Sequence, residues 1–364
     1  MNSIRDLDTK LADIRRKPLT LMPNFPEVAE RWENWWNFKA DRPLLIGYVS
    51  CPGTAVPEES GFNLLDQPAR YVASRRAYVE SKIWLGDTIP SARIELGPVA
   101  LGGMLGAPLK LMENEGTTWQ DPIIRDWDHP PPLSLDPDNR WFKIVSALAD
   151  ALAQDAVGHY AVMLPELGGA VDVLSNLRDP NLLCLDVLEC PEKIRQAAMH
   201  VVESWQTVFS TQYQKIAGHG AVPIQWLGCW SDRPYAITTC DFNYMISPDA
   251  FTDICMPSIH EQATRVGRSV FHLDGAPRHV QALIDDPAIT AIQYSPGDGT
   301  PSALAYLDMF KRIQAAGKPV IVTTGAEEVK ELVRNLDKRG LVFRITPMRS
   351  AQMGADLLKI LEQA

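Results

Sequence analysis

The feature that most constrains the fold is a repeat in which short apolar runs alternate with longer amphipathic segments. Short apolar runs are typical of strands buried on both faces of a parallel sheet, and the amphipathic segments are typical of helices that cover it. In the second half of the chain we expect strands at 269–273, 289–294, 319–323 and 341–345. A helix is expected after each of them, near 277–285, 301–316, 326–338 and 349–362.

The first half repeats this pattern with longer connections. Strands are expected at 43–49, 89–96, 160–164 and 222–227, and helices over about 66–86, 141–157, 191–217 and 248–266. Eight strand–helix units predict one α/β domain over residues 41–364, a (β/α)8 TIM barrel. Residues 1–40 are expected to form a helical N-terminal arm packed on the barrel, and 97–140 a long insertion after the second strand. The alternative is an open doubly wound sheet, but no Gly-x-Gly-x-x-Gly or Gly-x-x-x-x-Gly-Lys segment follows a strand.

Charge and composition narrow the class of protein. The 364 residues include 35 Lys and Arg against 45 Asp and Glu, a net charge of −10, and no basic block offsets it. This argues against binding to nucleic acid or to an anionic membrane. No charged-then-apolar leader and no long apolar run is present, and the 6 cysteines form no Cys-x-x-Cys pair. We therefore expect a cytoplasmic protein with reduced thiols.

In a barrel of this kind the chemistry lies at the carboxyl ends of the strands and in the loops that follow. The polar and aromatic residues expected there are Glu95, Glu166 with Asp172 beyond it, Trp226, Trp230, Arg233, Cys240, Asp241, His272, Asp274, Gln293, Tyr294 and Arg344. His272 and Asp274 are two residues apart on one strand, so both point to the same side. Because Val270 and Phe271 fill the rest of that strand, such polar groups must be hydrogen-bonded or functional.

Two interpretations of this pair remain open at this point. His272 could be a hydrogen-bonded histidine of the barrel, with Asp274 capping the next helix. Alternatively, the pair faces a pocket and titrates there. In the second case Asp241, His272 and Asp274 are the catalytic acid–base groups, and Asp274 orients the imidazole.

The other candidates are assigned to substrate binding. Arg233 or Arg344 would hold an anionic group, since a guanidinium pairs well with a carboxylate. Trp119, Trp226 and Trp230 would form an aromatic wall that excludes water. Glu95, Glu166, Gln293 and Tyr294 complete the expected lining. Imidazole, carboxylate and thiolate groups also bind zinc or a harder divalent ion, so the candidate metal ligands are His272, Asp274, Glu166 and Cys240.

Four segments resemble the uroporphyrinogen decarboxylase superfamily: CDFNYMISPDAF at 240–251, FHLDG at 271–275, IQYSPG at 292–297 and AGKP at 316–319. The resemblance covers about residues 40–360 and is clearest over 222–345. It implies a (β/α)8 barrel. One branch of this superfamily decarboxylates the acetate side chains of a tetrapyrrole without a cofactor. The other moves methyl groups between a corrinoid and a thiol, with zinc holding the thiolate.

The chain departs from the motifs of both branches. It lacks the paired N-terminal arginines of the tetrapyrrole decarboxylases, since Arg42 is followed directly by the apolar run of the first strand. The zinc methyltransferases carry His-x-Cys on the fifth strand and a further Cys on the eighth. Here Asp274 stands at the first Cys position, and the eighth strand has no Cys.

Three hypotheses follow. The leading one is a lyase of the decarboxylase-like branch that acts by acid–base chemistry on a small or medium polar organic molecule other than a tetrapyrrole. It requires no cofactor, and a divalent metal such as zinc is left open. The second is a corrinoid-linked methyltransferase with a modified metal site and a corrinoid protein as partner. The third is a non-catalytic barrel that binds a sugar or ring compound through its tryptophans. The resemblance also suggests a homodimer.

Overall fold

The computed structural model describes residues 7–54, 61–112, 116–275, 277–297 and 299–364, which form an α/β fold around a mostly parallel sheet. The order of the seven strands in this sheet is β2-β1-β12-β11-β10-β9-β8. Their bounds are β1 Leu44–Ser50, β2 Lys82–Gly86, β8 Ala236–Thr238, β9 Ser269–Asp274, β10 Ala291–Ser295, β11 Val320–Thr324 and β12 Leu341–Ile345. The pairs are parallel except for β1 with β2. Residues 1–6 of the expected arm lie outside the described residues.

A second parallel sheet has the order β3-β6-β7, with β3 Ser91–Arg93, β6 Ala161–Met163 and β7 Val222–Ile224. Side chains join the two sheets at both edges. The Thr88 hydroxyl, before β3, accepts from the Gly47 N–H of β1 at 2.7 Å. The Gln225 side-chain amide, after β7, donates to the Tyr235 carbonyl before β8 at 3.2 Å. This arrangement is consistent with the barrel expected from the sequence.

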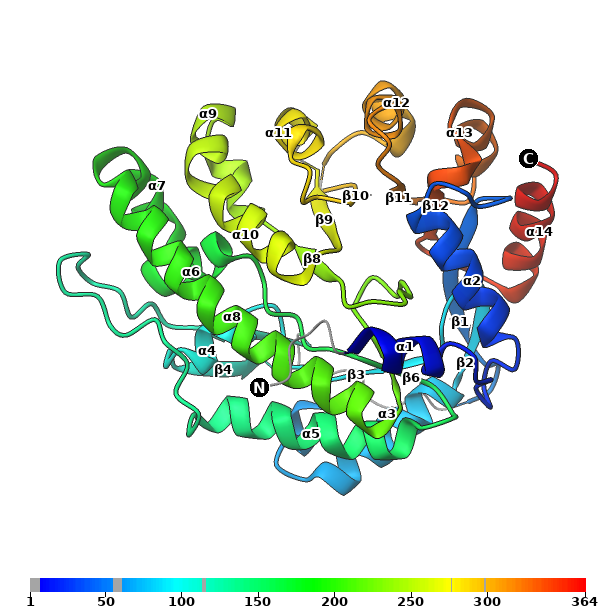
Figure 1. Cartoon of the computed structure of the whole chain (residues 1–364), viewed down its shortest axis with the longest axis horizontal. Coiled ribbons are helices and arrows are strands. Elements are labelled where there is room, and N and C mark those ends of the chain that lie inside the picture. The colour runs from blue at the N-terminus through cyan, green and yellow to red at the C-terminus, as the bar shows by residue number, and fades with distance from the viewer. Residues whose placement is uncertain (1–6, 55–60, 113–115, 276, 298) are drawn as a thin grey trace.

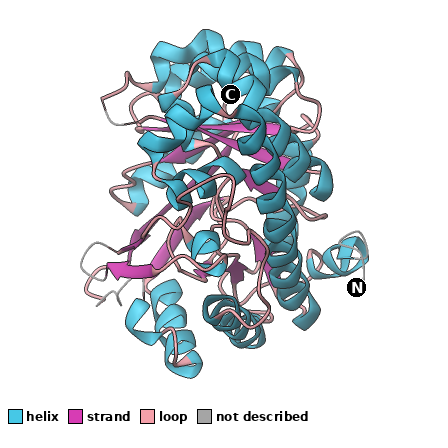
Figure 2. Cartoon of the chain, turned by 90° about the vertical axis from the view of Figure 1, so that its left-hand side faces the viewer, coloured by secondary structure: helices cyan, strands magenta, loops and turns pink. Residues whose placement is uncertain are grey.

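Helices cover the outside of the strands (Figure 1, Figure 2). Those of the repeat are α3 Pro68–Glu80, α5 Arg140–Ala156, α8 Pro191–His219, α10 Met256–Val266, α11 Val280–Asp285, α12 Leu307–Ala315, α13 Val329–Asn335 and α14 Ala351–Glu362. Each presents its apolar residues to the sheet; on α12, for example, Met309, Phe310 and Ile313 are buried. Further helices are α1 Asp8–Ile14, α2 Phe25–Trp36, α4 Ala100–Met104, α6 Ala170–Arg178, α7 Pro180–Glu189 and α9 Pro248–Ala250. A hairpin of β4 Leu109–Met112 and β5 Thr117–Gln120 lies in the expected insertion.

Each of the eight strands expected from the sequence is present, but the first half differs in detail. The helix expected over 66–86 ends at Glu80, where the Ser81 hydroxyl donates to the Tyr78 carbonyl, and 82–86 is the strand β2. The β-favouring residues Ile83 and Trp84 pair there with the open edge of β1. The short strand β8 and the helices α6 and α7 were not expected.

The N-terminal arm is fastened to the rest of the fold by its tryptophans and by a buried ion pair. The indole N–H of Trp32 donates to the Asp87 carbonyl at 3.1 Å, and that of Trp36 donates to the Trp230 carbonyl at 2.7 Å. Glu33 of α2 accepts from the Arg268 guanidinium at 3.0 Å, and both groups are buried. The arm therefore closes the side of the fold where β8 and β9 begin.

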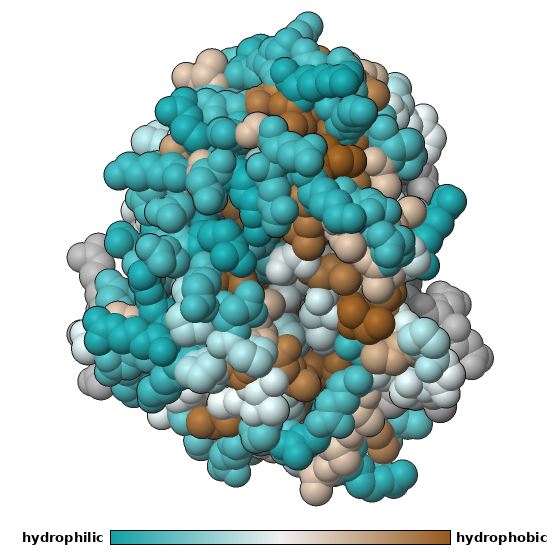
Figure 3. Space-filling view, turned by 90° about the vertical axis from the view of Figure 1, so that its right-hand side faces the viewer, coloured by the Kyte–Doolittle hydropathy of each residue, from teal (hydrophilic) through white to brown (hydrophobic). Residues whose placement is uncertain are grey.

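The surface is largely hydrophilic on the face that Figure 3 shows, with hydrophobic side chains gathered near its centre. None of the described helices combines the length and the apolar character that a membrane span requires.

Candidate active site

Three metal-ligating side chains lie together where β8 and β9 end. Asp241, His272 and Asp274 each offer one ligand atom, and these atoms lie within 4.8 Å of one another. We call this cluster the acidic end of the site. Asp241 is exposed, and the other two side chains are half-buried. One imidazole and two carboxylates suit zinc or a harder divalent ion, so the residues present fit such an ion.

The backbone around the acidic end explains how Asp241 reaches β9. Asp241 opens the 3-10 turn Asp241–Met245, and Tyr244 of this turn packs against Gly275, directly after β9. Gly275 has φ +50, and a Cβ there would overlap the Tyr244 hydroxyl. A residue with a side chain would therefore be strained at this φ, and the Tyr244 side chain would have to move. The glycine of the FHLDG segment thus permits the close contact between the turn and the end of β9.

The orientation of His272 is set by the next two strands. His272 Nδ1 is hydrogen-bonded to the amide oxygen of Gln293 on β10, and Gln293 Nε2 donates to Thr323 Oγ1 on β11 at 2.9 Å. Gln293 is fully buried. Because an amide oxygen accepts, Nδ1 carries the proton, which leaves Nε2 available as a base or as a metal ligand.

Guanidinium groups gather on the other side of His272. Arg344 of β12, Arg93 of β3 and Arg75 of α3 line a cavity of about 140 Å³, which we call the basic end of the site. The aromatic residues of this cavity are Tyr48, Tyr78, Trp84 and Trp226. The Trp226 ring lies 5.0 Å from the His272 ring in an edge-on contact, at an interplanar angle of 82°. Trp226 therefore joins the acidic end to the basic end.

Glu166 lies between the two ends. Arg93 forms ion pairs of 2.9 Å with both Glu95 and Glu166. Burial raises the pKa of Glu166, while the charges of Arg93 and His272 lower it and those of Glu95 and Asp241 raise it. The pKa of Glu166 thus depends on charged groups at both ends of the site.

Asp172 of α6 is a further buried carboxyl group beside the acidic end. Thr239 Oγ1 donates to it at 2.8 Å and the Phe242 N–H at 3.0 Å. Burial, followed by the charge of Asp241, raises the pKa of Asp172 to about 7. Asp172, Glu166, Asp241 and Trp119 all line a cavity of about 330 Å³. In the sequence Asp172 follows the third expected strand. In the structure its hydrogen bonds to the loop after β8 bring its carboxyl group beside the acidic end.

The structure thus brings together most of the residues predicted from strand ends. The acidic end holds Asp241, His272 and Asp274, while Glu95, Glu166, Trp226, Gln293 and Arg344 lie around it. Trp119 is 65% exposed and lines the larger cavity from the hairpin. Arg93 was not predicted, because the strand expected at 89–96 put it in the middle, whereas β3 ends at Arg93, and because its partner Glu166 is 73 residues away in the chain.

Four predicted site residues belong neither to the cluster nor to the lining of the two cavities. The buried Trp230 packs edge-on against Phe25 at 5.3 Å and anchors the arm. Tyr294, next to Gln293 on β10, points to the opposite face and packs against Tyr306 and Phe310 at 5.3 and 5.4 Å.

The other two interact with residues outside the cluster. Arg233 is exposed and lies beside Asp232 at 3.5 Å. The hydrogen bond between Cys240 and Cys255, together with burial, raises the pKa of the Cys240 thiol well above its usual range. Cys240 is not one of the three side chains that form the acidic end.

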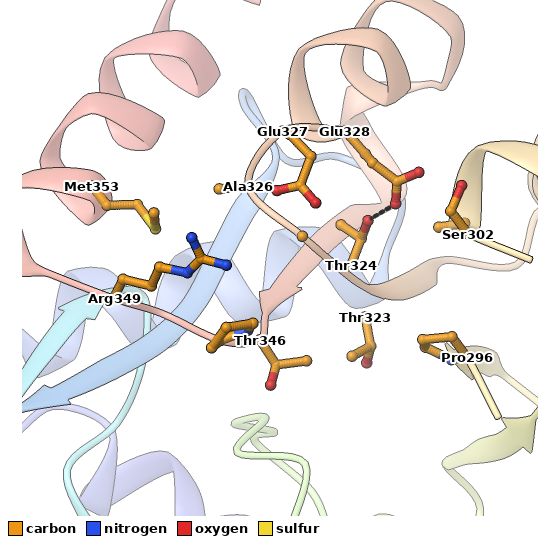
Figure 4. Close-up of a pocket in the computed structure, with 13 residues that line it drawn as sticks. Pro296, Ser302, Thr323, Thr324, Ala326, Glu327, Glu328, Thr346, Arg349 and Met353 are labelled. Carbon is orange, nitrogen blue, oxygen red and sulfur yellow. Dashed lines mark hydrogen bonds between the residues drawn. The ribbon is translucent and has the colours of Figure 1, made fainter. Parts of the chain in front are cut away.

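A further cavity of about 350 Å³ lies where β11 and β12 end (Figure 4). Thr324 and Glu328 are hydrogen-bonded to each other at its wall, and Arg349 and Glu327 extend from the loops around it. Thr323 lines this cavity and also holds Gln293, so the cavity borders the support of His272.

The fold has a counterpart among known structures. No family model matches the chain, and no curated protein matches it. Among solved structures it is similar to a methyltransferase from Methanosarcina mazei, with a TM-score of 0.63 and 12% sequence identity. The match covers 92% of this chain and 98% of that chain. At this identity the likeness establishes a shared fold.

Proposed function

We propose that this chain is a metal-dependent methyltransferase with a (β/α)8 barrel, in which Asp241, His272 and Asp274 hold a divalent cation. The observation that carries the proposal is the approach of their three ligand atoms to within 4.8 Å of one another. The cluster lies at strand ends, where barrels of this fold keep their active sites. The fold shared with a methyltransferase and the resemblance to the corrinoid-linked branch support the reaction class.

The bound ion would act as a Lewis acid on the heteroatom that exchanges the methyl group. Two carboxylates and one imidazole form a harder donor set than thiolates, which favours an oxygen atom at this position over sulfur. Gln293 is hydrogen-bonded to His272 Nδ1, so Nε2 would be the imidazole nitrogen available to hold the ion. The Trp226 ring contacts the imidazole edge-on and limits the space beside it.

Methyl transfer can be tested with a free corrinoid. Cob(I)alamin attacks the methyl carbon of a methyl ether, which yields methylcobalamin and the alcohol after protonation, and the absorbance change of the corrinoid reports the reaction. We expect zinc-loaded protein to catalyse this step for a subset of small methyl ethers. His272→Ala should abolish it. Equal rates for the zinc-loaded and the metal-stripped protein would contradict the proposal.

A second candidate is acid–base decarboxylation of a small organic acid. It is favoured by Asp172, whose pKa of about 7 would allow proton exchange at neutral pH beside Asp241. Release of carbon dioxide by metal-stripped protein, lost in Asp172→Asn, would favour this candidate over methyl transfer.

A further inference from the structure

Arg344 is an unusual residue for its place in the fold. It lies on β12 among Val342, Phe343 and Ile345, which are buried, and its own side chain is half-buried in the basic end. A guanidinium in such a place is normally paired with a carboxylate. Within the described residues, no hydrogen bond or ion pair of Arg344 is found. Burial, together with the charge of Arg93, lowers the pKa of Arg344, while Tyr48 and Cys229 raise it.

The acidic groups nearby do not neutralise Arg344. Glu95 and Glu166 are both bound to Arg93 at 2.9 Å. Burial raises the pKa of the Cys229 thiol far above its usual range, so Cys229 remains uncharged. Among the described residues, the lining of the cavity contains three guanidinium groups and one carboxylate, that of Glu95, which is paired with Arg93.

The shape of the basic end limits what can enter. The cavity of about 140 Å³ has the space of roughly four to five water molecules. Its aromatic walls suit a short carbon stem, while its guanidinium groups suit an oxyanion. Glu95 on the wall disfavours a second negative charge on the ligand, which favours a monoanionic carboxylate over a phosphonate.

We infer that Arg344, with Arg93 beside it, binds the carboxylate of the substrate, so that the substrate of the proposed methyltransferase is a small carboxylic acid. Trp226 lines the cavity of Arg344 and contacts the ring of His272 at 5.0 Å. In this binding mode the other end of the molecule extends beside Trp226 toward Asp241, His272 and Asp274. This assignment of the substrate class rests on the proposed function, whereas the binding of the carboxylate can be measured without it.

The test is the binding of acetate, benzoate and phenylacetate by isothermal titration calorimetry, with benzamide and phenylphosphonate for comparison. We expect at least one carboxylate to bind the wild-type chain more tightly than benzamide and phenylphosphonate. Arg344→Met should weaken its binding at least tenfold, and Arg344→Lys should weaken it less. Arg334→Met, which removes an exposed guanidinium on α13, should bind as the wild type does.

Three results would overturn the inference: no binding of any of the three carboxylates, equal carboxylate binding by wild type and Arg344→Met, or a preference for phenylphosphonate. The melting temperature of each variant shows whether it is folded, and Arg344→Lys keeps the test valid if Arg344→Met is not. Zinc binding by the same variants separates this inference from the proposed function. Arg344-dependent carboxylate binding in a chain that binds no metal would support the subsite and contradict the metal-dependent function.

Discussion

The two ends of the site carry opposite charge and satisfy it to different degrees. The acidic end brings two carboxylates and one imidazole within 4.8 Å of one another. The basic end places three guanidinium groups around a cavity of about 140 Å³, and one of them, Arg93, is paired with two carboxylates. Trp226 lies between the ends and contacts His272. Under the proposals above, each end binds a ligand group of the opposite charge.

Elsewhere in the molecule, buried charged side chains form ion pairs and hydrogen bonds with other residues. Arg268 is buried, as its partner Glu33 is, and it also donates to the Ser231 hydroxyl at 2.6 Å. Asp87 is fully buried and accepts from Arg31 at 2.7 Å and from Arg42 at 2.9 Å. Arg344 has no such partner among the described residues. The contrast supports the proposal that Arg344 binds a ligand, at a cost in stability.

The largest expected effect comes from His272→Ala, which removes the imidazole from the acidic end. Turnover should fall by about 10²–10⁴-fold, because both a metal ligand and the base are lost. The rate of corrinoid methylation by zinc-loaded protein measures this. His260→Ala, on the exposed part of α10, is the matched control and should be as active as the wild type. Turnover of His272→Ala close to the wild-type rate would show that the acidic end is not the reaction centre.

The two arginines Arg344 and Arg268 should respond to Met in opposite directions. Arg268→Met leaves the buried Glu33 carboxylate unpaired and should destabilise the fold by about 3–5 kcal/mol. Arg344→Met removes an unpaired guanidinium from a half-buried place and should stabilise the fold by about 1–2 kcal/mol. Urea unfolding gives both values. A loss of stability in Arg344→Met would mean that Arg344 is a structural residue.

Gln293 tests the support of the acidic end separately from its ligands. Gln293→Leu removes the acceptor of the His272 Nδ1 proton and should weaken zinc binding by about 10–100-fold. Gln293→Glu retains an acceptor and should preserve zinc affinity. Zinc affinities from a competing chelator measure both. If Gln293→Leu binds zinc as tightly as the wild type, Gln293 does not position the imidazole.

The smallest expected effect concerns His279, which supports the turn that carries Asp241. It is 2% exposed, and its Nε2 is hydrogen-bonded to the Asn243 carbonyl at 3.0 Å. Burial, aided by the charge of Arg278, lowers the pKa of His279 from its ordinary 6.5. Below pH 6.5 the unfolded chain therefore takes up a proton that the folded chain does not, so the free energy of unfolding falls as the pH falls. His279→Gln should make this slope shallower in urea unfolding between pH 5 and pH 7, and an unchanged slope would contradict the account.

The second half of the fold could be predicted from the sequence more closely than the first. The strand expected at 319–323 is β11 Val320–Thr324, and the one expected at 341–345 is β12. Uninterrupted apolar runs between capped helices fix such strands. In the first half, β8 spans only Ala236–Thr238, which is too short to produce a pattern. At 82–86 the pairing of β2 with the edge of β1 decided between strand and helix, and this long-range contact leaves no local signal.

The residues of the candidate site, like the strands, could be predicted only in part from the sequence. The strand-end rule located His272, Asp274, Gln293 and Arg344, because each lies at or near the carboxyl end of its strand. It did not separate Gln293 from Tyr294, since that choice depends on which face of β10 turns inward. Arg93 and Asp172 bind partners about 70 residues away in the chain, so these contacts could not be predicted, although Asp172 was expected just beyond a strand end.

The metal content of the full-length chain tests the central claim most directly. After incubation with zinc and removal of the excess, the wild type should retain about one zinc ion per chain, measured by inductively coupled plasma mass spectrometry. The double variant Asp241→Asn, Asp274→Asn should retain none. Asp308→Asn, which changes an exposed aspartate on α12, should retain as much as the wild type. Equal zinc retention by the double variant and the wild type, with both folded, would contradict the account.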